Sequence, residues 1–172
     1  MNIQKENYRI ATEQERVLIF EHFNHQDAWA LGSQVILDAN KLNIAIACDV
    51  WLNNFQVFRY GIEGTGQFHD LWLKRKMRTV TMFEKSSLRV HCMPYVGEDD
   101  LVKDAYLDPN IYSIMGGGFP IYVKNTGMVG VLCVAGGTHT QDHQIAANAI
   151  AKRLDVTIDQ VLDDRNGKLL EV

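Results

Sequence analysis

The sequence has few of the residues that mark linkers, disulfide frameworks or membrane spans. Its 172 residues include only three prolines and three cysteines, and no apolar run approaches the roughly 20 residues that a membrane helix needs. The N-terminus carries no apolar signal segment, and widely spaced cysteines without a Cys-x-x-Cys favour free thiols in a reducing compartment. We therefore expect one cytoplasmic domain over residues 1–172, with no membrane span.

The charge balance and the composition exclude two further classes of protein. There are 17 Lys and Arg against 21 Asp and Glu, a formal net charge of −4, so the chain lacks the basic surface that nucleic-acid binding needs. Apolar residues make up 47% and charged residues 22% of the chain, which is enough apolar material for a core and excludes a disordered chain. No nucleic-acid partner is expected.

Capping patterns and apolar spacing predict five helices. Thr12-Glu13-Gln14-Glu15 has the capping-box pattern and predicts the start of a short helix. Asn24, with Asp27 in the first turn, predicts the start of a second helix. Two longer helices are expected over residues 67–84 and 140–154, and a short final one begins at Thr157.

Five β-rich segments predict a sheet, at residues 44–51, 55–60, 88–93, 119–124 and 128–135. Asn53-Asn54 joins the first two segments as a hairpin, and Asn125-Thr126-Gly127 joins the last two. Hairpins separated by helices favour the α+β class, with a mainly antiparallel five-stranded sheet and helices packed on it. A doubly wound nucleotide-binding fold needs strict alternation of strands and helices, which this order lacks.

The helix expected over residues 67–84 places two cations on an apolar face. At about 100° per residue, Lys76 falls about 40° and Arg75 about 60° from Trp72, which lies at the centre of an apolar arc. Buried cations need partners, so both could hold a carboxylate or phosphate of an anionic ligand, with Ser86 as an added donor. Alternatively, the cations snorkel or pair with acids across a subunit boundary, and Ser86 is a turn residue. His69 lies on the same arc and could meet a haem or a metal.

A run of three glycines is the second candidate for a ligand contact. Gly116-Gly117-Gly118-Phe119 enters the strand expected over 119–124. Glycines permit backbone conformations in which exposed amides can contact an anion. The run lacks the Lys-Ser/Thr ending of a P-loop and precedes a strand, so a nucleoside triphosphate site is not expected. The alternative is a tight turn into the strand.

The third candidate is the junction between the strand that ends near Ala135 and the helix that follows. Helix N-termini bind anions, and Asp142 and His143 stand near this one. His139 and His143 are four residues apart and are candidate metal ligands, whereas Asp142 and His143 could act as an acid and a base. The alternative is that His143 caps or packs. No nucleophile elbow, Cys-His-Asn signature or His-Glu-x-x-His is present, so the sequence by itself shows no enzyme.

Several of these segments resemble the GlcG/HbpS-like family, and more closely its uncharacterised-protein-family branch of small cytoplasmic proteins. The resemblance covers residues 18–154. One position departs from the family pattern, which usually has a serine where Ala135 precedes the glycine. The segments that carry the resemblance are Asp27-Ala28-Trp29-x-Leu31-Gly32, Trp72-x-x-Arg75-Lys76, Ser86-Ser87-Leu88, Leu107-Asp108-Pro109, Gly116-Gly117-Gly118-Phe119-Pro120-Ile121 and Gly127-x-Val129-Gly130 through Asp142-His143.

The resemblance implies a profilin-like α+β domain with a core over residues 18–154, a short C-terminal helical extension, and homo-oligomers. The wider family is called haem-degrading, and some of its members bind haem. The leading hypothesis is an oligomeric cytoplasmic protein that binds a small anionic ligand, with haem as one candidate cofactor. The alternatives are an assembly protein without a small-molecule site, and an enzyme that uses Asp142 and His143. The site residues that the resemblance implies are Trp72, Arg75, Lys76, Gly117, Gly118, Asp142 and His143.

Overall fold

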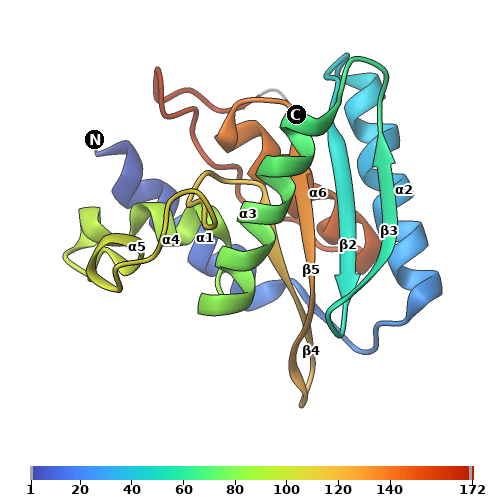
Figure 1. Cartoon of the computed structure of the whole chain (residues 1–172), viewed down its shortest axis with the longest axis horizontal. Coiled ribbons are helices and arrows are strands. Elements are labelled where there is room, and N and C mark those ends of the chain that lie inside the picture. Colours follow the sequence, from blue (N-terminus) through green and yellow to red (C-terminus); the bar gives the residue numbers. More distant parts are fainter. Residues whose placement is uncertain (1, 171) are drawn as a thin grey trace.

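The computed structural model describes residues 2–170 and 172. Its strands form one five-stranded sheet, and helices pack around this sheet (Figure 1). The elements follow in the order α1 (Ile3–Val17), β1 (Ile19–Phe20), α2 (His25–Lys41), β2 (Ala47–Leu52), β3 (Phe55–Gly61), α3 (Gln67–Phe83), α4 (Ser87–Cys92), the 3-10 helix η1 (Met93–Val96), α5 (Leu101–Asp104), β4 (Gly118–Val123), β5 (Gly127–Ala135) and α6 (His139–Leu154).

The strand order across the sheet is β1-β4-β5-β2-β3. The pairs β4–β5, β5–β2 and β2–β3 are antiparallel. The hairpins that join β4 to β5 and β2 to β3 require this arrangement of those two pairs. The two-residue strand β1 pairs with β4 in parallel, with Ile19 opposite Tyr122. The α+β class is therefore confirmed, but the sheet is mixed, because a strand from the N-terminal segment completes one edge.

Helices cover both faces of the sheet, with α2 and α6 on one face and α3 across the other (Figure 1). Successive side chains of a strand point to opposite faces, and the two central strands divide accordingly. The residues that pack toward α2 and α6 include Cys48, Val50, Leu132 and Val134. The residues that pack toward α3 are Ala47, Val131, Cys133 and Ala135.

Local signals set several of these elements as expected. Asn24 and Asp27 form a reciprocal capping box at the start of α2. Asn53 and Asn54 both adopt positive φ, 50° and 63°, at the β2–β3 hairpin. At the β4–β5 hairpin Asn125 has φ 60° and Gly127 has φ 104°. These short-range patterns confirm the predicted starts of α2 and the two hairpins.

The strand predicted over residues 88–93 is wrong, because this segment is the helix α4 followed by η1. The Ser86 side chain caps α4 by accepting a hydrogen bond from the Arg89 amide at 3.2 Å. Apolar residues alternate here as they do in a strand, and Leu88 and Cys92 instead pack with Ile10 of α1. Apolar alternation over six residues does not separate a strand from a short buried helix.

Near the chain ends, the predicted start of the first helix and the predicted last helix are also wrong. Thr12 lies inside α1, which begins nine residues earlier with Asn2 as its N-cap. The short helix expected from Thr157 is absent, since described residues 156–170 contain no helix and form a single bridge between Leu162 and Leu169. Long-range bonds hold this segment extended, such as the 2.7 Å bond from the Leu162 amide to the Asn7 side chain.

Candidate functional site

A pocket of about 310 Å³ opens between the N-terminal half of α3 and the loop that joins β5 to α6. Gly136 in this loop has φ 148°, and a β-carbon there would lie 2.2 Å from the Ala45 carbonyl oxygen. Glycine is therefore required where the chain leaves the sheet to form the pocket wall. The lining residues are Phe68, His69, Trp72, Lys76, Met115, Ala135, Gly136, Gly137, His139 and Asp142.

The floor of the pocket is a buried ion pair between α3 and α6. Lys76 Nζ lies 2.9 Å from Asp142 Oδ2 and donates to the Val134 carbonyl at 2.8 Å. Asp142 Oδ1 accepts the Gly137 amide at 2.8 Å. Both residues are only 3% exposed. The predicted burial of Lys76 is thus seen, and its partner is a carboxylate of the same chain, which leaves the floor with no net charge.

The three glycines 116–118 let the backbone pass close to the Lys76–Asp142 pair. A β-carbon at Gly117 would lie 2.3 Å from the Val134 carbonyl oxygen and 2.7 Å from Lys76 Nζ. At Gly116 it would lie 2.4 Å from the His139 carbonyl oxygen. All three glycines are buried and none lines the pocket. In this structure they pack closely against neighbouring backbone at the entry to β4.

Aromatic side chains of α3 form one wall of the pocket. The Phe68 and Trp72 rings meet edge to face, with centroids 6.2 Å apart. The Arg75 guanidinium lies 5.3 Å from the Trp72 ring centroid, and its Nε donates to the Asn110 carbonyl at 3.1 Å. Arg75 is outside the pocket lining. The two cations predicted on the apolar face of α3 therefore lie in different places. Lys76 is at the pocket floor, and Arg75 packs against Trp72 outside the pocket lining.

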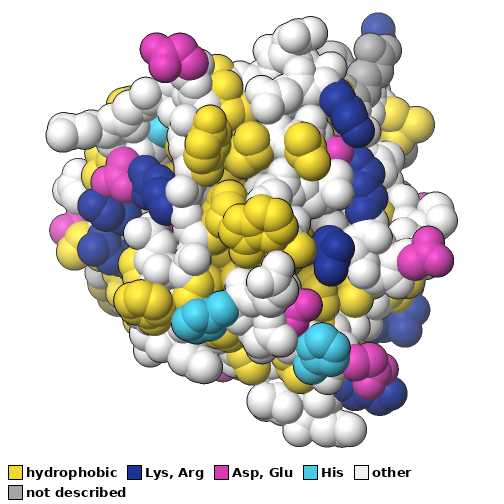
Figure 2. All heavy atoms as spheres, turned by 90° about the vertical axis from the view of Figure 1, so that its right-hand side faces the viewer, with side chains coloured by type: hydrophobic (Ala, Val, Ile, Leu, Met, Phe, Trp, Pro, Cys, Tyr) yellow, Lys and Arg dark blue, Asp and Glu magenta, His cyan; other side chains and the backbone are white. Residues whose placement is uncertain are grey.

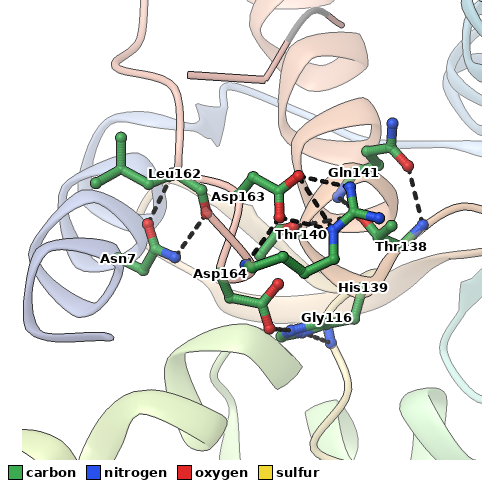
Figure 3. A network of polar contacts seen from close by, with 10 residues as sticks. Asn7, Gly116, Thr138, His139, Thr140, Gln141, Leu162, Asp163 and Asp164 are labelled. Carbon is green, nitrogen blue, oxygen red and sulfur yellow. Dashed lines mark hydrogen bonds and ion pairs between the residues drawn. The ribbon is translucent and has the colours of Figure 1, made fainter. Parts of the chain in front are cut away.

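His139 lies at the rim with both ring nitrogens engaged (Figure 3). Its Nδ1 accepts the Gly116 amide at 3.3 Å, so Nε2 carries the proton that is shared with Asp164 Oδ2 at 2.6 Å. A nitrogen that accepts an N–H has no lone pair left for a metal. Within residues 2–170 and 172, no group of three His, Cys, Asp or Glu side chains could hold a metal ion.

Asp142 and His143 point to different parts of the molecule, because consecutive residues of a helix are about 100° apart. His143 is fully buried, donates from Nε2 to Gln14 Oε1 at 2.8 Å, and packs 5.5 Å from the Phe119 ring centroid. Burial lowers the pKa of His143 to about 3, so the imidazole is neutral. The acid–base pair considered from sequence is not assembled, and neither His143 nor Phe119 lines the pocket.

Ser86 is the remaining sequence candidate, and it too lies away from the pocket. It is buried at the start of α4, and its amide donates to Glu15 Oε1 at 2.8 Å. The next residue, Ser87, accepts the Gly118 amide at 3.0 Å through its hydroxyl. Both serines thus join helices and the entry to β4 without reaching the pocket lining.

Among the lining residues, Phe68 and Met115 were not singled out as ligand contacts from sequence. Phe68 carried a usable signal, because it lies on the apolar arc of the helix that also holds Trp72. Met115 carried none, because it reaches the rim from an irregular segment. Sequence patterns report neighbours within one element, and this pocket joins three separate segments.

A second acidic group, Asp49, is buried on the α3 side of the sheet. Its Oδ2 accepts from Gln56 at 3.2 Å and lies 3.6 Å from Arg59 Nη1. Its Oδ1 has no hydrogen-bond partner among the described residues, and neither does Trp51 Nε1. Burial raises the pKa of Asp49 to about 6. Asp49 is outside the lining of the α3 pocket.

Comparison with known proteins places these features in a family. The family model described as "Haem degrading protein HbpS-like" matches residues 23–151. A UPF0303 protein of Streptomyces coelicolor is 32% identical over 140 residues, which cover 81% of this chain and 89% of the relative.

Two solved structures share the fold at low sequence identity. The crystal structure of Ybr137w protein has a TM-score of 0.78 and 22% identity, covering 86% of this chain and 87% of that one. The crystal structure of a PduOC–haem complex has a TM-score of 0.65 and 16% identity, covering 80% and 97%. At these identities the likeness shows the fold alone.

Proposed function

Because the chain belongs to the HbpS-like family of haem-degrading proteins, we propose that the pocket beside α3 binds a flat, largely apolar small molecule, with haem as the first candidate. The observation that carries this proposal is the chemistry of the lining. Phe68, Trp72 and Met115 provide apolar surface above a floor whose charges cancel, and the pocket is open on one side. Such walls suit the face of an aromatic ring system.

The residues of this pocket fit a haem. His69 lines the pocket, and its Nδ1 accepts the Gly66 amide at 3.2 Å. Its Nε2 makes no hydrogen bond within residues 2–170 and 172. It can present Nε2 to iron if the ring proton moves to Nδ1 and the contact with Gly66 is given up. Phe68 and Trp72 would hold the ring, and the thioether of Met115 lies in the same lining. Bound haem would supply a redox-active iron.

The ion pair between Lys76 and Asp142 changes where an anionic group of the ligand is expected to bind. Lys76 already has Asp142 as its partner, so an anion at the floor would have to replace a buried carboxylate. Arg75 lies behind Trp72 and not in the lining. We therefore assign any carboxylates of the ligand to the open mouth, where water can solvate them.

The alternative that this is an assembly protein no longer needs Arg75 and Lys76 at a subunit boundary. Arg75 and Lys76 both have partners within the chain, so they are not needed to pair with acids across a subunit boundary. Self-association remains a proposal that rests on the family resemblance. The enzyme alternative has less support, because the side chains of Asp142 and His143 contact different residues. Asp142 pairs with Lys76, and His143 bonds to Gln14.

The cellular location is likewise a proposal. No helix among residues 2–170 and 172 is long and apolar enough to cross a membrane. Cys48, Cys92 and Cys133 are free and buried, and burial raises the pKa of each thiol. Three free thiols are typical of a reducing compartment, which supports the cytoplasm.

The ligand proposal is tested by titrating the protein with haemin and following the absorption band of bound haem. We expect one haem per chain, at least tenfold weaker binding for Trp72→Ala, and a shifted band for His69→Ala if its imidazole contacts iron. His22→Ala is the matched control, because His22 is exposed beside Asp27 and outside the pocket. Iron-free protoporphyrin separates ring stacking from iron contact. Equal binding by Trp72→Ala and His22→Ala would contradict this site.

A further inference from the structure

A primary amine lies at the floor of the α3 pocket. Lys76 belongs to the pocket lining and is nevertheless only 3% exposed. Lysine is almost never buried to this extent unless it is paired, because water solvates an ammonium so well. A desolvated amine beside a cavity is the arrangement of lysines that form covalent bonds to carbonyl ligands. The contacts of the Lys76 nitrogen therefore decide what chemistry it can carry out.

The hydrogen bonds of Lys76 leave one of its three protons without a partner. An ammonium carries three N–H donors and no acceptor. Lys76 Nζ donates to the Val134 carbonyl at 2.8 Å and to Asp142 Oδ2 at 2.9 Å. It makes no third hydrogen bond within residues 2–170 and 172. One position at Nζ thus remains available to an atom of a ligand in the pocket.

Asp142 can take up the proton that the amine must lose before it reacts. Its Oδ2 lies 2.9 Å from Lys76 Nζ, which is within the distance for direct proton transfer. The Gly137 amide donates to Asp142 Oδ1 at 2.8 Å, so the carboxylate is held with its other oxygen toward the amine. Moving the proton from Nζ to Oδ2 turns two buried charges into a neutral pair, so the floor has no net charge before or after the transfer.

We propose that Lys76 forms an imine with a flat aromatic aldehyde bound in the α3 pocket. The ammonium passes one proton to Asp142, and the lone pair of Nζ forms a bond to the carbonyl carbon. The carbonyl oxygen takes one of the two protons left on nitrogen and becomes a hydroxyl. Asp142 returns its proton to this hydroxyl, which leaves as water while the C=N bond forms. The product is a protonated imine beside the Asp142 carboxylate, so the buried ion pair is restored and no oxidant or reductant is needed.

The surroundings of the amine favour an aldehyde over a ketone. Space beside Nζ is small, because a β-carbon at Gly117 would lie 2.7 Å from it. An aldehyde carbon carries a hydrogen where a ketone carries a second carbon group, so an aldehyde fits better. The Phe68 and Trp72 rings offer an apolar wall to a flat ring. The volume of about 310 Å³ is at the lower end for small-molecule sites, which suits one or two rings.

Lys74 provides a control within the same helix. Its Nζ pairs with Asp70 at 2.7 Å, so Lys74 and Lys76 each have a carboxylate partner at a similar distance. The Lys74 side chain is 51% exposed and lies outside the pocket lining. A difference in reaction between the two amines therefore reports the pocket and not the presence of a carboxylate.

The experiment uses salicylaldehyde, a flat aromatic aldehyde, at one equivalent per chain. Sodium cyanoborohydride reduces any imine to a stable secondary amine, and peptide mass spectrometry locates the adduct on each lysine. We expect at least about tenfold more adduct on Lys76 than on Lys74 after the same time, because a bound aldehyde is held beside one amine. Working with the wild-type chain avoids a Lys76 variant, which would leave Asp142 buried without its cation.

Two exposed phenylalanines on different sides of the molecule supply matched variants. Phe68 lines the pocket and is 68% exposed. Phe55 is 64% exposed at the start of β3, on the side of the molecule that Figure 2 shows, and is outside the pocket lining. Phe68→Ala should lower the adduct on Lys76 about fivefold through lost ring contact, whereas Phe55→Ala should leave it unchanged. Circular dichroism establishes that both variants are folded.

Two results would overturn the proposal: an adduct on Lys76 no larger than that on Lys74, and equal Lys76 adducts in Phe68→Ala and Phe55→Ala. The inference rests on the proposed ligand pocket but not on haem as its occupant, and haemin titration separates the two. Haemin binding without a Lys76 adduct contradicts the imine and leaves the haem proposal standing. A Lys76 adduct without haemin binding supports the imine alone, and protection of Lys76 but not of Lys74 by haemin supports both.

Discussion

The two faces of the sheet bury different kinds of side chain. Between the sheet and helices α2 and α6 lies one large apolar cluster that includes Leu31, Phe119 and Ile150, with the neutral imidazole of His143 beside it. The side covered by α3 has a smaller apolar cluster and buries Asp49 together with the Lys76–Asp142 pair. The first face supplies stability through burial, whereas the second carries costly charged groups next to the pocket.

The largest effect is expected from breaking the ion pair at the pocket floor. Lys76→Ala leaves Asp142 buried without its cation, which should lower the free energy of unfolding by about 3–5 kcal/mol. Urea denaturation measures this change. The double variant Lys76→Met/Asp142→Leu should recover most of the loss, because apolar residues of similar volume replace such pairs well. Lys74→Ala, which removes an exposed pair with Asp70, should change stability by less than about 0.5 kcal/mol.

The second effect belongs to the apolar face. Leu31 is fully buried in the cluster under α2, and Leu31→Ala should cost about 3 kcal/mol through lost burial and a cavity. Haemin affinity of the folded protein should stay unchanged, since this face is separated from the pocket by the sheet. Leu169→Ala is the control, because Leu169 is 67% exposed. Weakened haem binding in Leu31→Ala would contradict the division between the two faces.

The third effect concerns Asp49 on the α3 side. Its pKa is raised to about 6 by burial, so the folded state is penalised above that pH, relative to an unfolded chain that ionises near pH 4. Asp49→Asn should therefore raise stability by about 3 kcal/mol at pH 7.5, with the gain fading between pH 6 and pH 4. Thermal unfolding at several pH values measures it.

The matched control for Asp49 is Asp70, which also contacts Arg59. Hydrogen bonds from Lys74 and Arg59 lower the pKa of Asp70, so its carboxylate favours folding. Asp70→Asn should therefore be neutral or destabilising at pH 7.5. A stabilising effect of the same size in both variants would show that net charge, and not the burial of Asp49, is responsible.

The smallest effect is the opposite pH dependence of His143. Burial lowers its pKa to about 3, so below its ordinary value near 6.5 the unfolded chain takes up a proton that the folded chain does not. Stability due to this group is lost as pH falls, by about 2 kcal/mol between pH 6.5 and pH 5. Relative to wild type, His143→Gln should lose less stability over this interval. His22→Gln, at an exposed position, should follow wild type.

The two groups together predict a compensation between the faces. Between about pH 4 and pH 6, folding adds a proton at Asp49 and removes one at His143, so their slopes cancel. Asp49→Asn should then show a stability that falls toward acid more steeply than that of the wild type. If Asp49→Asn and His143→Gln gave slopes of the same sign relative to wild type, the assignment of the two pKa shifts would be incorrect.

Much of the fold was accessible from short-range patterns. The capping box of Asn24 and Asp27 and the two hairpins are decided by neighbours in the sequence, so they were predicted correctly. The segment over residues 88–93 was not, because its apolar residues alternate as in a strand while packing against α1 makes it a helix. The two-residue strand β1 carries too little pattern to be recognised, since its pairing with β4 spans about a hundred residues.

For the site, the sequence predicted only what the periodicity of the single helix α3 can show. The spacing around Trp72 places Lys76 on the covered side of α3, and Lys76 is buried as expected. The same spacing could not show that Asp142 neutralises it, since the two residues are 66 positions apart. Nor could it show that Phe68, Leu71 and Met82 remain exposed. The predicted apolar arc is wider than the surface that the sheet covers.

By itself the sequence determined the α+β class, the two hairpins, the burial of a lysine on α3 and the family resemblance, because each depends on local propensity, helical period or motif. The tertiary structure alone decided that this lysine pairs with Asp142, that the glycine run packs closely at the entry to β4, and that large aromatic residues of α2 and β3 stay exposed. These outcomes depend on contacts between distant segments, which amino-acid spacing does not encode.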